Sequence, residues 1–180
     1  NYNFDEHNQL ELSYTSSLHP DKQQSVTSLD NTSTTFNHAP AEEQMHNVAL
    51  NYTSGFGLTG GIDYTYFRNK EEQSFRSIEN NGQETTFLSN TAQYINRWKV
   101  YVDQTLSNAW VLNYGTSFTY VNNHNSQRYN LAAMSGMNKE SRVDEYTYNL
   151  YTGFEKNFGS QWSLNASASI EYYQMMSYKK

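Results

Sequence analysis

Residues 162–172 read WSLNASASIEY and alternate without a break between two kinds of side chain. One set is mainly apolar and consists of Trp162, Leu164, Ala166, Ala168, Ile170 and Tyr172. The other set is polar throughout and consists of Ser163, Asn165, Ser167, Ser169 and Glu171. Successive side chains of a β-strand point to opposite faces of its sheet. The pattern therefore predicts a long strand with one apolar and one polar face.

The same alternation recurs along the chain. It covers six further segments, residues 9–15, 47–53, 58–67, 97–103, 110–120 and 146–155. Together with 162–172 this makes seven predicted strands. A chain built from alternating strands predicts an all-β fold.

The predicted connections alternate between short and long. The short turns lie near 54–57, 106–109 and 157–161. The long polar loops lie near 16–44, 68–91 and 121–142. An antiparallel up-and-down meander would place all short turns at one end and all long loops at the other, as in transmembrane β-barrels. We therefore expect residues 1–180 to form a single segment of such a barrel, built from long strands.

Strand length and aromatic placement favour the same fold. A strand of about 11 residues, tilted by about 40°, rises roughly 27 Å, close to the apolar height of an outer-membrane barrel. Trp110, Phe154 and Trp162 lie beside the short turns, whereas Tyr66, Tyr120, Tyr146 and Tyr172 lie at the opposite strand ends. Aromatic side chains at both ends predict two girdles at the membrane surfaces.

Composition excludes several classes of protein. The net charge is −6 and no basic run is present, so we expect no nucleic-acid binding, which needs clustered positive charge. The chain has no Cys, which excludes disulfides and thiolate metal sites. No apolar run approaches the roughly 18 residues of a transmembrane helix. Aromatic residues make up 16% of the chain, which is not typical of a disordered segment.

No motif in the chain indicates an enzyme. Residues 55–60 match the G-x-G-x-x-G spacing, but a predicted strand follows them, whereas a dinucleotide site needs a helix there. The five His residues lack the spacing of a metal site. We predict no catalytic residue, no metal ligand and no cofactor.

Three charged residues are the candidates for ligand binding. Arg97, Lys99 and Asp103 share the polar face of one predicted strand. They fit either cross-strand ladders with neighbouring strands or contact with a ligand or an internal domain. The sequence leaves both interpretations open.

Residues 144–165, which read DEYTYNLYTGFEKNFGSQWSLN, resemble a barrel hairpin of TonB-dependent outer-membrane receptors, in the form common in Bacteroidetes. Residues 10–15 and 60–66 look like the same family. The resemblance implies a plugged barrel of about 22 strands in the outer membrane of a Gram-negative bacterium. It also implies uptake of a siderophore, cobalamin or a glycan, with outer-membrane lipid, a plug domain and TonB as partners.

The chain departs from a complete receptor in several ways. It is too short, shows no plug or TonB box, and ends Tyr178-Lys179-Lys180 rather than on an aromatic residue. Seven strands also differ from the even counts of bacterial single-chain barrels. We therefore expect an internal piece of the barrel, about a third of it. Alone, such a piece should self-associate, because it exposes two strand edges and an apolar face.

Two other functions remain open. One is a soluble all-β binding module on the cell surface, such as an adhesin or a glycan-binding domain. The other is a small complete outer-membrane barrel. A soluble module would enclose Leu112, Leu150, Leu164 and Ile170 in the middle of a compact monomer, whereas a barrel would leave them on its exterior.

Overall fold

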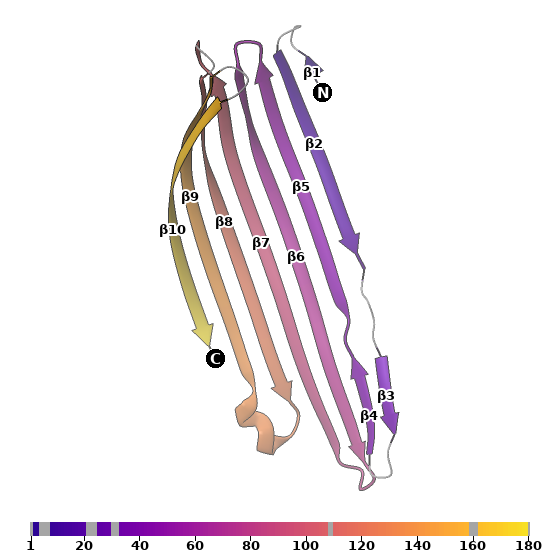
Figure 1. Cartoon of the computed structure of the whole chain (residues 1–180). Coiled ribbons are helices and arrows are strands. Elements are labelled where there is room, and N and C mark those ends of the chain that lie inside the picture. Colours follow the sequence, from indigo (N-terminus) through magenta and orange to yellow (C-terminus); the bar gives the residue numbers. More distant parts are fainter. Residues whose placement is uncertain are drawn as a thin grey trace.

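The computed structural model describes residues 2–3, 8–20, 25–29, 33–107, 110–158 and 162–179. Within these ranges the chain forms antiparallel strands and one 3₁₀ helix, η2 (Ala132–Met137), and it contains no α-helix (Figure 1). The all-β prediction is confirmed.

The strands are β1 (Tyr2–Asn3), β2 (Asn8–His19), β3 (Ser25–Leu29), β4 (Ser33–His38), β5 (Ala41–Ser54), β6 (Leu58–Glu79), β7 (Glu84–Thr105), β8 (Trp110–Tyr129), β9 (Lys139–Phe158) and β10 (Trp162–Lys179). Their order in the sheet is β1-β2-β5-β6-β7-β8-β9-β10, and β4 pairs with both β3 and β6. Apart from the break between β2 and β5, sequence neighbours are also sheet neighbours. The predicted up-and-down meander is confirmed, and the sheet is open.

Strands β4 and β5 form one line along β6. His38 opposes Ser74 and Ala41 opposes Glu71, so the register is the same on both sides of the break. Pro40 lies in the break, has no N–H to donate, and accepts a hydrogen bond from the Glu72 N–H at 3.0 Å. The seven predicted strands correspond to β2 and β5–β10, whereas β1, β3 and β4 were not predicted.

The predicted long loops are mainly strand, and that prediction was wrong. Segment 68–91 is crossed by β6 and β7, which leave only residues 80–83 between them. Segment 121–142 holds the ends of β8 and β9 on either side of residues 130–138. Segment 16–44 contains β3 and β4. Alternation in the sequence reveals a strand only where one of its faces is apolar. Backbone hydrogen bonds between strands also form where both faces are mainly polar.

The predicted short turns agree with the strand bounds. Between β5 and β6, the Gly57 N–H donates to the Ser54 carbonyl at 3.1 Å, and Gly57 has a φ of 80°. A three-residue hairpin loop needs this left-handed conformation, which glycine adopts without steric cost. The turns predicted at 106–109 and 157–161 fall between β7 and β8 and between β9 and β10, partly outside the described residues. We call this end of the sheet the turn end and the opposite end the far end.

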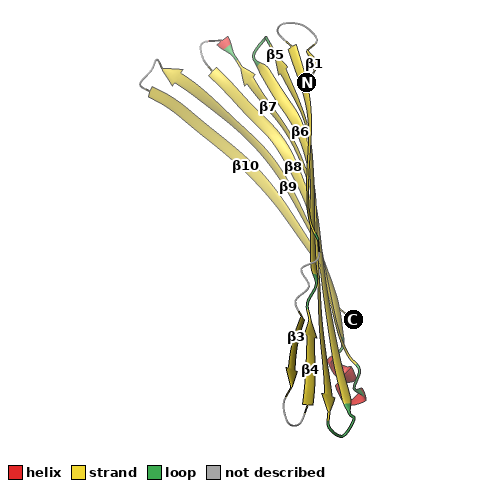
Figure 2. Cartoon of the chain, turned by 90° about the vertical axis from the view of Figure 1, so that its right-hand side faces the viewer, coloured by secondary structure: helices red, strands yellow, loops and turns green. Residues whose placement is uncertain are grey.

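Residue parity separates the two faces of the sheet. Directly opposed residues share a face, and from β2 to β10 along the main order every opposed pair joins two even or two odd numbers. Even-numbered residues therefore form one face, the even face, and odd-numbered residues form the odd face. Figure 2 shows the sheet as a single twisted layer. No hydrophobic side chain in the described part of the chain is buried.

Candidate functional site: the two faces of the sheet

The even face carries an apolar band between the turn end and the middle of the sheet. Its members come from all seven long strands and include Leu12, Leu50, Ile62, Val100, Leu112, Leu150, Leu164 and Ile170. Leu150 is 61% exposed and Ile170 is 73% exposed. Leu164 is 47% exposed and Leu112 is half-buried. The residues that a compact monomer would enclose thus lie on an open surface.

An aromatic belt limits the apolar band on its far side. It crosses the sheet through Tyr14, His46, Tyr64, Tyr66, Trp98, Phe118, Tyr120, Tyr146, Tyr148 and Tyr172. Neighbouring rings touch, with centroids 4.3 Å apart for Tyr64 and Trp98 and 4.8 Å apart for Phe118 and Tyr148. The belt contains Tyr66, Tyr120, Tyr146 and Tyr172, which were predicted at the far strand ends. Their predicted position was wrong, because β6, β8, β9 and β10 continue beyond them and the belt therefore lies within the strands.

The tyrosine hydroxyls at the belt turn away from the apolar band. Tyr64 donates to Asn96 at 2.8 Å and Tyr120 donates to Asp144 at 2.9 Å. In both pairs the partner lies one cross-strand step nearer the far end. The tip of a tyrosine is polar and its ring is apolar, so the belt marks a boundary between an apolar and a polar environment.

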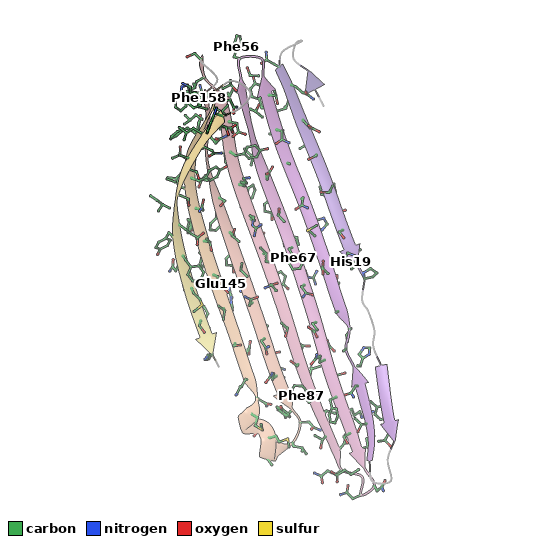
Figure 3. The ribbon with its side chains drawn as sticks, viewed as in Figure 1. His19, Phe56, Phe67, Phe87, Glu145 and Phe158 are labelled. Atoms are coloured by element: carbon green, nitrogen blue, oxygen red, sulfur yellow. The ribbon has the colours of Figure 1, made fainter. Side chains whose placement is uncertain are left out.

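The other limit of the apolar band shows the mirror arrangement. Tyr52 donates its hydroxyl to Asn8 at 3.1 Å, in the direction of the turn end. The ammonium group of Lys156 also lies at this limit, with its Nζ 4.6 Å from the ring centroid of Trp110 and 5.0 Å from that of Phe158. Figure 3 shows Phe158 at this end of the sheet and Phe87 towards the far end. Polar tips therefore point outward at both limits of the band.

The candidate ligand residues Arg97, Lys99 and Asp103 share the odd face of β7, but Arg97 and Asp103 are separated by about 20 Å along the strand. Asp103 accepts a hydrogen bond from the Asn113 side chain at 2.8 Å, a cross-strand contact of the kind expected in a ladder. The Lys99 Nζ lies 5.0 Å from the ring centroid of Tyr101. Arg97 and Lys99 form no ion pair with any described residue. Both cations remain available on the polar face.

Tyrosines and glycines alternate across the odd face at one level. Gly61, Tyr101, Gly115 and Tyr151 oppose one another in turn on β6 to β9. Tyr101 donates to the Asn51 side chain at 2.6 Å. A Cβ on Gly115 would lie 2.6 Å from the Tyr151 hydroxyl and would also collide with the Val100 carbonyl. The glycines therefore make room for phenol rings that lie across the sheet.

Sequence reasoning missed this tyrosine–glycine row. A glycine inside a strand is a signal of close approach by another group, but the approaching tyrosines come from neighbouring strands. Only the register identifies them.

A buried carboxylate lies just beyond the aromatic belt on the even face. Asp144 is 3% exposed and is the one buried charged side chain among the described residues. It accepts hydrogen bonds from Tyr120 and Asn122 and pairs with Arg142 at 3.1 Å. Burial alone would raise the pKa of Asp144, but the bonds from Asn122, Tyr120 and Arg142, together with the Arg142 charge, hold it below its ordinary value. These contacts hold β8 and β9 together on the even face at the edge of the belt.

Within the described ranges no group of three metal-ligating side chains is present. Nor is any helix in those ranges long and apolar enough to cross a membrane. Comparison with models of known protein families and with curated proteins found none that matches this chain.

Proposed function

We propose that this chain is a wall segment of an outer-membrane β-barrel, from a TonB-dependent receptor that imports a nutrient such as a siderophore, cobalamin or a glycan. The even face meets lipid and the odd face lines the water-filled bore. The segment performs no chemistry. Its contribution is to hold the barrel in the membrane and to hydrate the path of the ligand.

The orientation of the tyrosine tips carries this proposal. Tyr64 and Tyr120 point their hydroxyls towards the far end, and Tyr52 points its hydroxyl towards the turn end. Between these limits the exposed even face is mainly apolar. A slab of lipid explains both observations, because it solvates aliphatic side chains and leaves polar tips to reach water on either side.

The height of the apolar band supports the same function. On β10 it runs from Trp162 to Tyr172. At about 3.3 Å per residue and a tilt of about 40° these residues span roughly 25 Å, the height of the lipid-facing band of outer-membrane barrels.

The alternatives have less support. A soluble binding module needs a second layer over Leu150, Leu164 and Ile170, and the described chain provides none. A small complete barrel needs its two edges to pair, but within the described ranges β10 pairs with β9 alone. The open sheet is instead what a segment of a larger wall would show.

The proposal locates the protein in the outer membrane of a Gram-negative bacterium. Outer-membrane lipid is its direct partner, and a plug domain and TonB are partners of the full-length receptor. Arg97, Lys99 and Asp103 would face the bore, where a ligand or the plug can reach them. No cofactor and no nucleic acid is involved.

Spin labels at two adjacent residues test the proposal. The 180 residues contain no native Cys, so Ile170→Cys on the even face and Ser169→Cys on the odd face introduce single labelling sites. In outer-membrane vesicles that carry the full-length receptor, the label of Ile170→Cys should collide with lipid-soluble oxygen and not with a water-soluble nickel complex. The label of Ser169→Cys should show the smaller ratio of oxygen to nickel collisions. Equal ratios at the two sites would remove the proposal.

A further inference from the structure

Three aromatic side chains form a row on the odd face, near the far end of the sheet. Phe75 of β6 opposes Phe87 of β7, and Phe87 in turn opposes Tyr129 of β8. The ring centroids of Phe87 and Tyr129 lie 4.8 Å apart. Figure 3 shows Phe87 in this part of the sheet. We call Phe75, Phe87 and Tyr129 the ring row. In the sequence they fall in two of the predicted loops, so only the register brings them together.

Part of each side chain in the ring row is open to solvent. All three side chains are half-buried, and the described strands belong to one sheet, so no second sheet covers the row (Figure 2). Neighbouring strands lie about 4.8 Å apart, which gives the row a length of roughly 10 Å from β6 to β8. Apolar surface that is left in water is unfavourable. The row therefore provides ring faces against which another molecule can pack.

Neutral polar side chains frame the ring row on both sides. Within one cross-strand step of the rings they include the amides and hydroxyls of Asn37, Gln73, Ser77, Thr85, Ser89 and Gln127. Among the described residues of these three levels, the odd face carries one charge, that of Lys139 at the start of β9. The rings therefore lie in a surface that is rich in hydrogen-bonding groups and nearly free of charge.

The ring row also lies far from the aromatic belt. Phe75 is nine residues beyond Tyr66 of the belt on the same strand, a rise of roughly 23 Å for a tilted strand. The headgroup layer outside the hydrocarbon core is only about 5–8 Å thick. Outer-membrane barrels place their longer extensions outside the cell. In the proposed barrel the row therefore faces the outer mouth of the bore, beyond the lipid.

We propose that the ring row binds a neutral oligosaccharide. This inference rests on the proposed function and narrows its substrate class from three nutrients to a glycan. The weakly positive C–H groups of a sugar ring pack against the negative face of an aromatic ring. Sugar hydroxyls exchange hydrogen bonds with amides and hydroxyls such as those of Asn37, Gln73 and Gln127. An anionic ferric siderophore would instead need several cations, and the length of the row suits linked sugar rings better than a single one.

Replacement of two rings by leucine tests the site. Phe87→Leu/Tyr129→Leu removes two flat faces and keeps apolar side chains on β7 and β8. Phe118→Leu/Tyr148→Leu is the matched control, because that pair also joins neighbouring strands with ring centroids 4.8 Å apart but lies on the even face. Each full-length receptor is purified in a detergent that carries no sugar. Calorimetry then measures the binding of neutral hexasaccharides built from glucose, mannose, galactose or xylose.

At least one hexasaccharide should bind the wild type. Phe87→Leu/Tyr129→Leu should bind it about tenfold more weakly or worse, the loss expected for two ring contacts, and the control should bind it like the wild type. The exchange Phe87→Tyr/Tyr129→Phe keeps both rings and should keep the affinity, which a loss of binding through misfolding would not explain.

Several results would overturn the inference. Wild-type affinity in the leucine variant would do so, and so would equal loss in the control or loss in the exchange variant. Binding of a ferric siderophore or cobalamin that Phe87→Leu/Tyr129→Leu abolishes would assign the ring row to that ligand instead. If the Ile170→Cys label reports lipid while no hexasaccharide binds, the inference fails and the proposed function stands. Equal collision ratios at the two labelled positions would remove the proposed function whatever the sugar affinity.

Discussion

The hydroxyl of Tyr120 donates a hydrogen bond of 2.9 Å to the buried carboxylate of Asp144 on the neighbouring strand. This contact joins the last aromatic residue of the apolar band on β8 to the first charged group beyond it on β9. The ring of Tyr120 belongs to the apolar environment, where it lies 5.0 Å from the ring of Tyr146. Its tip belongs to the polar network that Asp144 organises. One side chain thus joins both environments at the edge of the band.

Tyr120→Phe should separate these two roles. The variant keeps the ring and loses the donor, so we expect a loss of stability of about 1 kcal/mol from the missing hydrogen bond, with membrane insertion unchanged. Thermal unfolding of the full-length receptor in detergent measures the loss. Tyr114→Phe is the matched control, because Tyr114 makes no side-chain hydrogen bond with any described residue. Equal effects of the two substitutions would contradict the role of the Tyr120–Asp144 contact.

The Asp144 network should make stability depend on pH. The folded pKa of Asp144 lies below its ordinary value of 3.8, so the ionised carboxylate stabilises the folded state. That contribution is complete above the unfolded pKa of about 4 and is lost as the pH falls below it, through the folded pKa. Unfolding of the wild type and of Asp144→Asn, measured between neutral and strongly acidic pH, checks this. The difference in stability between them should shrink on acidification, and a constant difference would refute the assignment.

Gly115→Ala should lower the free energy of unfolding more than Gly136→Ala does. Its added Cβ would lie 2.6 Å from the Tyr151 hydroxyl and against the Val100 carbonyl, and such overpacking costs about 1–3 kcal/mol. Gly136→Ala is the control, since a Cβ there meets nothing within 4 Å. Denaturant unfolding in detergent compares them. Tolerance of both substitutions would show that the tyrosine–glycine row is not tightly packed.

A lysine on either face should report which side meets lipid. Ile170→Lys puts a charge within the apolar band, two residues from Tyr172 at its limit. If that band lies in a membrane the charge costs roughly 1–2 kcal/mol there, because the cost of about 2–4 kcal/mol at the midplane falls towards the interfaces. Ser169→Lys puts the same charge on the odd face. The yield of folded receptor in the outer membrane, read from heat-modifiable gel mobility, should fall for Ile170→Lys and stay near wild type for Ser169→Lys. A lower yield for Ser169→Lys than for Ile170→Lys would mean that lipid meets the odd face, which would contradict the proposal.

The isolated 180-residue chain should self-associate in plain buffer. Its even face exposes Leu150, Ile170 and their neighbours, and the open sheet leaves strand edges that can pair with another copy. Light scattering should show oligomers that detergent disperses. A strictly monomeric species in buffer would contradict this prediction.

The alternation of residues 162–172 was enough to predict the first 11 of the 18 residues of β10, because a period of two appears wherever one face of a strand is apolar. The same reasoning found the other six long strands and the short turns. It failed where neither face is apolar. The paired segments between Arg68 and Tyr94 alternate too weakly to be recognised as strand, and they were taken for a loop.

The sequence by itself determined the all-β class and the apolar and polar sides of each strand, because side-chain parity is a local property of the backbone. It also put Arg97, Lys99 and Asp103 on one side of β7. Tertiary structure alone decided which residues meet across strands. Tyr151 lies over Gly115, Tyr120 reaches Asp144, and Lys70 shares a level with Arg142. These relationships follow from the register, which hydrogen bonds between distant segments set and no local pattern encodes.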